Sequence, residues 1–165
     1  MKTVRLFASW VSVFYFGILI NQACAQLGGL ALPSAPYSSI QSASASIPGV
    51  VRHAAFNGAA VVRNVIDDGG TSIAEYADST GRIFAYTWHG PTMPDLRALL
   101  GDYLGAYRAG ASEQASAAPL TASLHASRVQ AGDVIVETGG RMRAYTGRAW
   151  LPAALPPGIT PADLR

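Results

Sequence analysis

The chain is poor in cysteine, in lysine and in charge. It has one cysteine, Cys24, and one lysine, Lys2, and charged residues make up only 13% of it, so arginine is the main basic residue. Because Cys24 lies within an apolar leader, removal of that leader would exclude both disulfides and thiol chemistry. The chain also lacks G-x-S-x-G, H-E-x-x-H, G-x-G-x-x-G and a phosphate-binding loop, and these absences argue against several catalytic and nucleotide-binding classes.

The N-terminus has the pattern of a secretory leader. Lys2 and Arg5 supply a positive start, residues 6–20 form an apolar run, and Ala-Cys-Ala follows. This pattern predicts a signal peptide of residues 1–25 and a periplasmic or secreted protein. The apolar run is shorter than the roughly 20 residues of a spanning helix, so no stable membrane insertion is expected after cleavage. Lipidation of Cys24 is the alternative, although the residues before it match the lipidation pattern poorly.

Acidic and basic residues balance once the leader is removed. The whole chain has 12 Lys and Arg against 10 Asp and Glu, and the leader contains Lys2 and Arg5. This balance excludes a strong bulk attraction to nucleic acid or to an anionic membrane. The remaining basic residues are all arginine, which fits either recognition of carboxylates and phosphates or biased codon usage. We expect an unknown protein partner in the cell envelope and no nucleic acid.

Composition divides the rest of the chain into a tail and a domain. Residues 26–49 are rich in Ser, Ala and Pro and predict a disordered tail. Residues 50–165 are expected to form a single α+β domain, in which residues 109–123 have the composition of a flexible connector. About 140 residues follow the leader, which is enough for one domain with its own core.

Short runs rich in β-branched and aromatic residues predict antiparallel hairpins that form a sheet. Turn signals DDGG, DSTG and TGG separate several of these runs. Phe84, Tyr86 and Trp88 alternate with smaller residues, so they are expected to share one face. That face is either a core stripe or an exposed aromatic platform for a ligand. The expected strands are residues 59–66, 71–77, 82–88, 124–129, 134–137 and 141–146.

The stretch from Thr92 to Arg108 predicts one amphipathic helix packed on the sheet. Thr92 is expected to cap its N-terminus, with Asp95 three residues later. Gly101 and Gly105 lie four residues apart where glycine is costly, and they predict either a close approach within the fold or a groove for a partner. The apolar stripe consists of Leu96, Leu99, Leu100, Tyr103, Leu104 and Tyr107.

The two halves of the predicted domain share ordered matches, which suggest an internal half-repeat. GRIFAYT matches GRMRAYT, and GPTMPDLR matches GITPADLR further along the chain. Glu75 and Glu137 would then be equivalent, as would Asp95 and Asp163. Twinned acids of this kind are more typical of groups that hold a fold than of a catalytic pair. Chance combined with shared turn chemistry is the alternative.

Histidine supplies the candidates for metal or acid–base chemistry. His53, His89 and His125 lie on three separate segments, so no metal site and no cofactor are predicted. His89 follows Trp88 and precedes the expected helix, which makes it the best single candidate for general acid–base catalysis. The spacing places no nucleophile or second base beside it.

Two longer motifs carry a resemblance. WHGPTMPDLRALLG runs from Trp88 to Gly101, and ETGGRMRAYTGRAWLP runs from Glu137 to Pro152. Together with LGG after the leader, they resemble the bacterial secreted proteins grouped as domain of unknown function 2844, over nearly all of the mature chain. His89 occupies a variable position of that pattern, which weakens a catalytic role for it. The resemblance implies an exported protein and supplies no activity, cofactor or catalytic residue.

Three functions remain open at this point. The preferred one is a non-catalytic periplasmic interaction or accessory module. The alternative is a glycan or small-ligand binder that uses the aromatic strand face, and the least favoured is a hydrolase that uses His89. The candidate binding residues are Trp88, His89, Arg97, Gly101 and Gly105.

Overall fold

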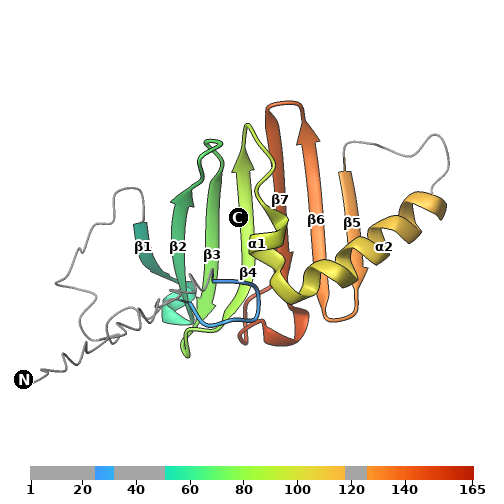
Figure 1. Ribbon diagram of the computed structural model, residues 1–165. Helices are drawn as coiled ribbons and strands as arrows, with labels where there is room; N and C mark the ends of the chain where they lie inside the picture. The colour runs from blue at the N-terminus through green and yellow to red at the C-terminus, as the bar shows by residue number, and fades with distance from the viewer. Residues whose placement is uncertain (1–24, 32–50, 118–125) are drawn as a thin grey trace, which may run out of the picture.

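The computed structural model describes residues 25–31, 51–117 and 126–165. In this part of the chain, seven antiparallel strands form one open sheet, and a helical segment crosses one of its faces (Figure 1). The predicted α+β class is therefore confirmed. The strands are β1 (Val51–Ala55), β2 (Ala60–Ile66), β3 (Ser72–Asp78), β4 (Ile83–Gly90), β5 (Ala126–Ala131), β6 (Val134–Arg141) and β7 (Ala144–Trp150).

Two meanders meet at the centre of the sheet. The strand order is β1-β2-β3-β4-β7-β6-β5, so β4 of the first meander pairs with β7 of the second. This central pair runs antiparallel from Ala85 opposite Trp150 to Gly90 opposite Tyr145. Because the register continues across six strands from β2 to β5, residues far apart in sequence form side-chain rows perpendicular to the strands.

The helical segment has a kink that the apolar periodicity did not predict. It consists of α1 (Leu96–Leu100), the 3₁₀ turn η3 (Gly101–Tyr103) and α2 (Leu104–Ala117). Gly101 has φ 52° and ψ −119°, which ends α1 and which a residue with a side chain rarely adopts. The sequence predicted one continuous helix over residues 92–108. The helical segment instead starts at Leu96, is interrupted at Gly101 and ends at Ala117, so the prediction is wrong on all three points.

The N-terminus of α1 is capped by Asp95 and not by Thr92. The Asp95 carboxylate accepts the backbone N–H of Arg97 at 2.8 Å, which satisfies one of the donors that every helix start leaves unpaired. Thr92 instead lies against the buried side chain of Thr71, with 2.9 Å between their hydroxyl oxygens. That contact ties the β4–α1 connection to the start of β3.

Helix α2 extends into the predicted connector 109–123. It continues to Ala117 and contacts β5, so the part of the connector up to that residue is helical. A Cβ atom at Gly110 would lie 2.9 Å from Cγ1 of Val129, which shows how closely α2 approaches β5. Residues 118–123 of the predicted connector lie outside the described residues.

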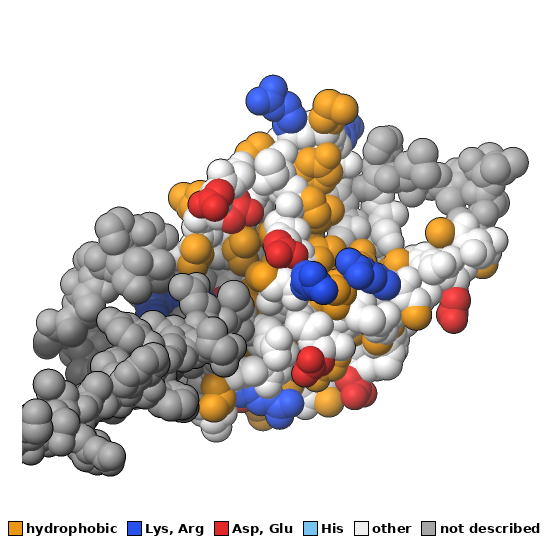
Figure 2. All heavy atoms as spheres, viewed as in Figure 1, with side chains coloured by type: hydrophobic (Ala, Val, Ile, Leu, Met, Phe, Trp, Pro, Cys, Tyr) orange, Lys and Arg blue, Asp and Glu red, His pale blue; other side chains and the backbone are white. Residues whose placement is uncertain are grey.

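Around α2, acidic and basic side chains are interspersed on the visible face (Figure 2).

A core cluster fills the space between the helical segment and the sheet. Leu100 is completely buried in it, and Tyr86 and Trp88 are each 2% exposed. The predicted Leu/Tyr stripe is confirmed as the packing face, because its remaining members also lie in or against this cluster. Those members are Leu96, Leu99, Tyr103, Leu104 and Tyr107.

Residues 25–31 belong to the folded domain, which corrects the predicted start of the disordered tail and the predicted domain boundary. Leu27 is 2% exposed in the helix-side core, and its N–H bonds to the carbonyl of Leu99 at 2.9 Å. Gly28 donates to the carbonyl of Ile83 at 2.8 Å, and Ile83 donates back to Gly29 at 2.9 Å. The segment thus joins the end of α1 to the start of β4. The rest of the predicted tail, 32–49, lies outside the described residues.

The chain after β7 covers part of the opposite face. It contains two 3₁₀ turns, η4 (Pro152–Ala154) and η5 (Pro161–Asp163), and its Ile159 and Leu164 pack in a second cluster with Trp150. Asp163 accepts bonds from the side chain and the backbone N–H of Thr160. These hydrogen bonds lower the pKa of the Asp163 carboxyl below its usual value.

The register contradicts the residue-by-residue half-repeat. Both halves contain a three-stranded meander, but Glu75 pairs with Tyr86 while Glu137 pairs with Arg148. Tyr86 belongs to the helix-side cluster, whereas Arg148 lies over the ring of Trp150 on the other face. The two glutamates therefore point to opposite faces and are not equivalent.

The turn between β6 and β7 lies further along the chain than the TGG sequence predicted. Strand β6 continues through TGG to Arg141, and the tight turn places Arg143 at φ 66°. Gly139 and Gly140 are therefore ladder residues, each opposite a residue of β7.

Over the described residues, no helix is long and apolar enough to cross a membrane.

Candidate ligand-binding groove

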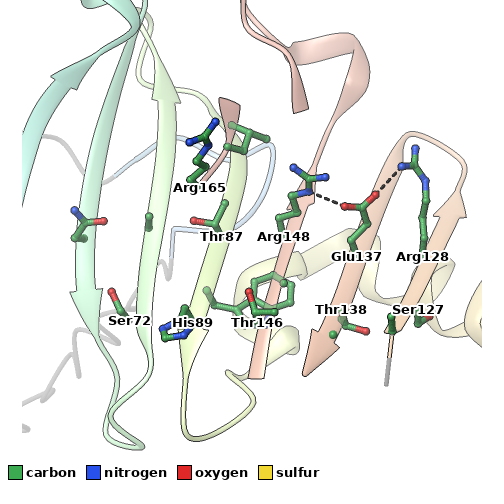
Figure 3. Close-up of a pocket in the computed structure, with 17 residues that line it drawn as sticks. Ser72, Thr87, His89, Ser127, Arg128, Glu137, Thr138, Thr146, Arg148 and Arg165 are labelled. Atoms are coloured by element: carbon green, nitrogen blue, oxygen red, sulfur yellow. Dashed lines mark hydrogen bonds and ion pairs between the residues drawn. The ribbon is translucent and has the colours of Figure 1, made fainter. Parts of the chain in front are cut away.

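A groove of about 700 Å³ lies on the sheet face opposite the helix, beside the segment that follows β7. Two side-chain rows form its floor (Figure 3). We call them the hydroxyl row and the charged row. The hydroxyl row consists of Ser72, His89, Thr146, Gly139 and Ala126. The charged row consists of Asn64, Ala74, Thr87, Arg148, Glu137 and Arg128.

Strand alternation and register bring these residues together. Successive side chains of a strand point to opposite faces, so every second residue of β4, β7, β6 and β5 faces the groove. The next row along the strands contains Trp150 and Ile135, and the chain after β7 covers it. The groove is therefore a part of this face that the protein's own described chain leaves open.

Glu137 lies between the two arginines of the charged row. One carboxylate oxygen accepts a bond of 2.6 Å from Arg128, and the other accepts a bond of 2.6 Å from Nε of Arg148 (Figure 3). Arg148 also donates to the backbone carbonyl of Pro161, which ties the row to η5. The three charges are thus held in fixed positions by charge-assisted hydrogen bonds.

The guanidinium groups of Arg128 and Arg148 both lie over the ring of Trp150. The guanidinium carbon of Arg128 lies 5.7 Å from the ring centroid, and that of Arg148 lies 5.2 Å from it. The ring is 1% exposed, so it is part of the core and also the surface on which two cations rest. This stacking limits the motion of side chains that would otherwise be flexible.

The side chains that line the groove carry a net positive charge. Arg128, Arg148 and Arg165 line it, and among its described lining residues Glu137 is the only one with a carboxylate side chain. A guanidinium has five N–H donors, whereas Glu137 offers two oxygens, each already bonded to one arginine. The arginines therefore retain donor capacity for an anionic ligand.

Gly147 in β7 makes room for Trp88 on the reverse side of the groove. A Cβ atom at Gly147 would lie 2.4 Å from the Trp88 ring and 2.5 Å from the backbone oxygen of Glu137. Trp88 borders the groove but packs in the helix-side core. Its Nε1 is buried and has no hydrogen-bond partner among the described residues.

His89 is exposed at the edge of the groove. Its cross-strand neighbours are Ser72 on one side and Thr146 on the other. Figure 3 shows Ser72 beside His89 and the charged row further along the strands. The lining carboxylate, Glu137, already bonds to two arginines and is not a cross-strand neighbour of His89. Hydroxyl and imidazole groups are thus adjacent, without a carboxylate in the row to orient the imidazole.

The five predicted binding residues do not form one site. Trp88 and His89 border the groove, whereas Arg97 is exposed on α1 on the other side of the sheet. Gly101 faces the chain's own Gln26, because a Cβ atom there would lie 2.1 Å from the Gln26 Oε1 atom. Gly105 is exposed on α2 with open space beside it. Among the described residues, the two glycines therefore do not line a common groove.

The predicted aromatic platform is also absent. Phe84 is fully buried and Tyr86 and Trp88 are each 2% exposed, so none of the three rings can stack on a ligand. Nor do they share a face. Phe84 packs in the cluster opposite the helix, whereas Tyr86 and Trp88 pack in the helix-side cluster. The pairing of β3 with β4 shifts its register between Tyr76 and Ala77.

Sequence reasoning missed Arg128, Glu137 and Arg148 as site residues. Their only signal was the arginine-only composition of the mature chain, which fits carboxylate or phosphate recognition. Among the described residues, no group of three or more His, Cys, Asp or Glu side chains is arranged to hold a metal ion. His53 lies on β1 and does not line the groove, and His125 is outside the described ranges.

The comparison with known families confirms the resemblance carried by the two long motifs. The model described as "Protein of unknown function (DUF2844)" matches residues 23–164. No curated protein and no solved structure matches the chain. The matched range includes every strand of the sheet and nearly all of the groove. The chain therefore belongs to the DUF2844 family of proteins of unknown function.

Proposed function

We propose that the protein is an exported, non-catalytic binding module whose groove binds a small, hydroxylated, carboxylate-bearing ligand such as an acidic saccharide. The observation that carries this proposal is the charged row, in which Arg128 and Arg148 lie over Trp150 and both bond to Glu137 at an open surface. Export is proposed from the leader pattern at the N-terminus.

The charge arrangement favours a carboxylate. Planar guanidinium groups match the two oxygens of a carboxylate, and prior positioning lowers the entropic cost of binding. Glu137 holds the arginines apart and also repels an anion, so we expect moderate affinity that weakens as salt is added. A ligand oxygen would bind the donors that Glu137 does not use.

The neighbouring hydroxyl row favours a polar ligand. Ser72 and Thr146 of this row offer hydroxyl donors and acceptors, as does Thr87 of the charged row, and His89 adds an imidazole. A volume of about 700 Å³ lies in the range of small-molecule sites. The described lining offers no exposed aromatic ring for stacking, so binding is expected to depend on hydrogen bonds and charge.

Replacement of Arg128 by Gln should weaken binding of a uronic acid oligomer about tenfold, because one charge-assisted hydrogen bond is worth about 1.5 kcal/mol. The Arg128 side chain is 59% exposed, so the variant should fold normally. Isothermal titration calorimetry checks the affinity. Arg141→Gln is the matched control, since Arg141 is exposed at the end of β6 and does not line the groove. Equal losses in both variants, or none in either, would count against the proposal.

A hydrolase is the second candidate, favoured by the register that places Ser72 opposite His89 in the groove. A serine nucleophile needs a base within hydrogen-bond reach and, usually, a third group that orients that base. A fluorophosphonate probe distinguishes the two candidates. We expect no labelling of Ser72 and no loss of ligand affinity beyond about threefold in His89→Ala, since the charged row carries most of the binding. Covalent labelling that disappears in His89→Ala would establish the hydrolase instead.

A further inference from the structure

Part of the groove floor lies beyond the contacts of Glu137. Thr87 of β4 is the member of the charged row next to Arg148, and Ala74 of β3 follows on its other side. Thr87 is 8% exposed, and its hydroxyl has no hydrogen-bond partner among the described residues. A polar group that is mostly buried is costly without a partner, because it has given up most of its contact with water. Since Thr87 lines the groove, its hydroxyl is available to a ligand there.

Tyr76 holds Arg165 at this part of the floor. The Tyr76 hydroxyl donates to the backbone carbonyl of Arg165, and the Arg165 N–H donates to the Tyr76 oxygen at 3.2 Å. Tyr76 is 3% exposed and pairs with Ala85, two residues before Thr87 on β4. Leu164 is buried in the second cluster and anchors the preceding residue. The guanidinium of Arg165 is thereby brought to the groove, where Figure 3 shows it next to Thr87.

Arg165 differs from the two arginines of the charged row because it has no carboxylate partner. Those two share Glu137, whereas no ion pair engages the guanidinium of Arg165 among the described residues. Asp163 attracts Arg165 electrostatically, but its Oδ2 atom accepts both bonds from Thr160. The N–H donors of the Arg165 guanidinium are therefore open to an anionic group in the groove.

We propose that Thr87 and Arg165 form a second anion-binding position in the groove, so that the groove prefers saccharides with two carboxylates to those with one. This inference rests on the proposed function. One carboxylate accepts hydrogen bonds from the Thr87 hydroxyl and the Arg165 guanidinium. The other binds the donors of Arg128 and Arg148 that Glu137 does not use. The second position has no carboxylate of its own to repel the ligand.

Strand spacing determines how far apart the two carboxylates must be. Thr87 is on β4, and the paired arginines are on β7 and β5, on either side of β6. Neighbouring strands lie about 4.8 Å apart, so the second position is about 10 Å from the centre of the arginine pair. One carboxylate cannot reach both positions. An oligomer of uronic acids carries a carboxylate on every sugar, so a single chain can supply both.

The experiment measures the preference between two trisaccharides by isothermal titration calorimetry, on the full chain expressed with its leader. One is trigalacturonic acid, and the other is a galactose trisaccharide in which one sugar is galacturonic acid. The wild type should bind the first more tightly. That preference should fall about tenfold in Arg165→Gln, which removes a charge-assisted contact, and about threefold in Thr87→Val, which removes a neutral one. Thr87→Ser keeps the hydroxyl and should retain the preference, as should the control Arg141→Gln.

The outcomes separate this inference from the proposed function. Thermal melting checks that each variant folds, and Arg165→Gln alone decides if Thr87→Val does not, because Arg165 is exposed. An unchanged preference in Arg165→Gln, with trigalacturonic acid still bound more weakly by Arg128→Gln, would overturn the second position alone. Failure of the wild type to bind either trisaccharide would overturn the proposed function, and this inference with it.

Discussion

Replacement of Leu100 by Asp is expected to leave the chain unfolded. Leu100 is fully buried between the helical segment and the sheet. The substitution removes about 2 kcal/mol of apolar burial and places a carboxylate where no partner is available, at a further cost of several kcal/mol. The sum is comparable to the total stability of a domain of this size, which is about 5–15 kcal/mol. Far-ultraviolet circular dichroism and thermal melting measure the result.

The matched control for Leu100→Asp is Ala106→Asp. Ala106 is exposed on α2, so the same new charge there should change the melting temperature by only a few degrees. A soluble Leu100→Asp protein with native circular dichroism and a cooperative transition would show that the helix does not pack on the sheet through this side chain.

Replacement of Leu27 by Ala is expected to destabilise the protein by about 3 kcal/mol, although the residue lies in a segment with the composition of a loose tail. Leu27 is 2% exposed in the core, and truncation of a buried leucine leaves a cavity that the surroundings fill only partly. Urea unfolding of the chain that starts at Gln26 measures the change. Loss of about 3 kcal/mol corresponds to about a 10 °C lower melting temperature.

The same segment supplies the control for Leu27→Ala. Leu30 is 72% exposed only three residues later, so Leu30→Ala should change the unfolding free energy by less than about 0.5 kcal/mol. Equal effects of the two substitutions would mean that residues 25–31 do not form part of the core in solution.

The elements that could be predicted are those determined by local sequence. Strands β2, β3 and β4 are separated by glycine-containing turns, and Gly70 and Gly81 adopt the positive φ values that such turns require. The apolar stripe of the helix was also visible, because helical periodicity depends on neighbours three and four residues away. Each of these signals is complete within about ten residues of chain.

The elements that were missed depend on distant contacts. Residues 25–31 contain little periodicity, and their order comes from backbone bonds to Ile83 and Leu99. Helix α2 is largely exposed and small-residue-rich, so its extension to Ala117 gave no amphipathic signal. Its close contact with Val129 of β5, made possible by Gly110, is a tertiary interaction.

The groove could not be predicted, because it depends on register. Arg128, Glu137 and Arg148 come from three strands, and they meet only if TGG is paired in the ladder and the turn falls at Arg143. Placing the turn at TGG, as its glycines suggested, would give β6 and β7 a different pairing. A one-residue change of register moves a side chain to the opposite face. The charged row is thus a property of strand pairing.

The central claim is that the groove binds an anionic, hydroxylated ligand through the charged row. The most direct test is a nuclear magnetic resonance titration of the mature chain with a galacturonic acid oligomer, beside the neutral galactose oligomer. The account predicts saturable shifts at Thr87, Glu137 and Arg148 with the acidic oligomer alone, and weaker binding as salt is added. Equal responses to both oligomers, or shifts confined to α2, would contradict it.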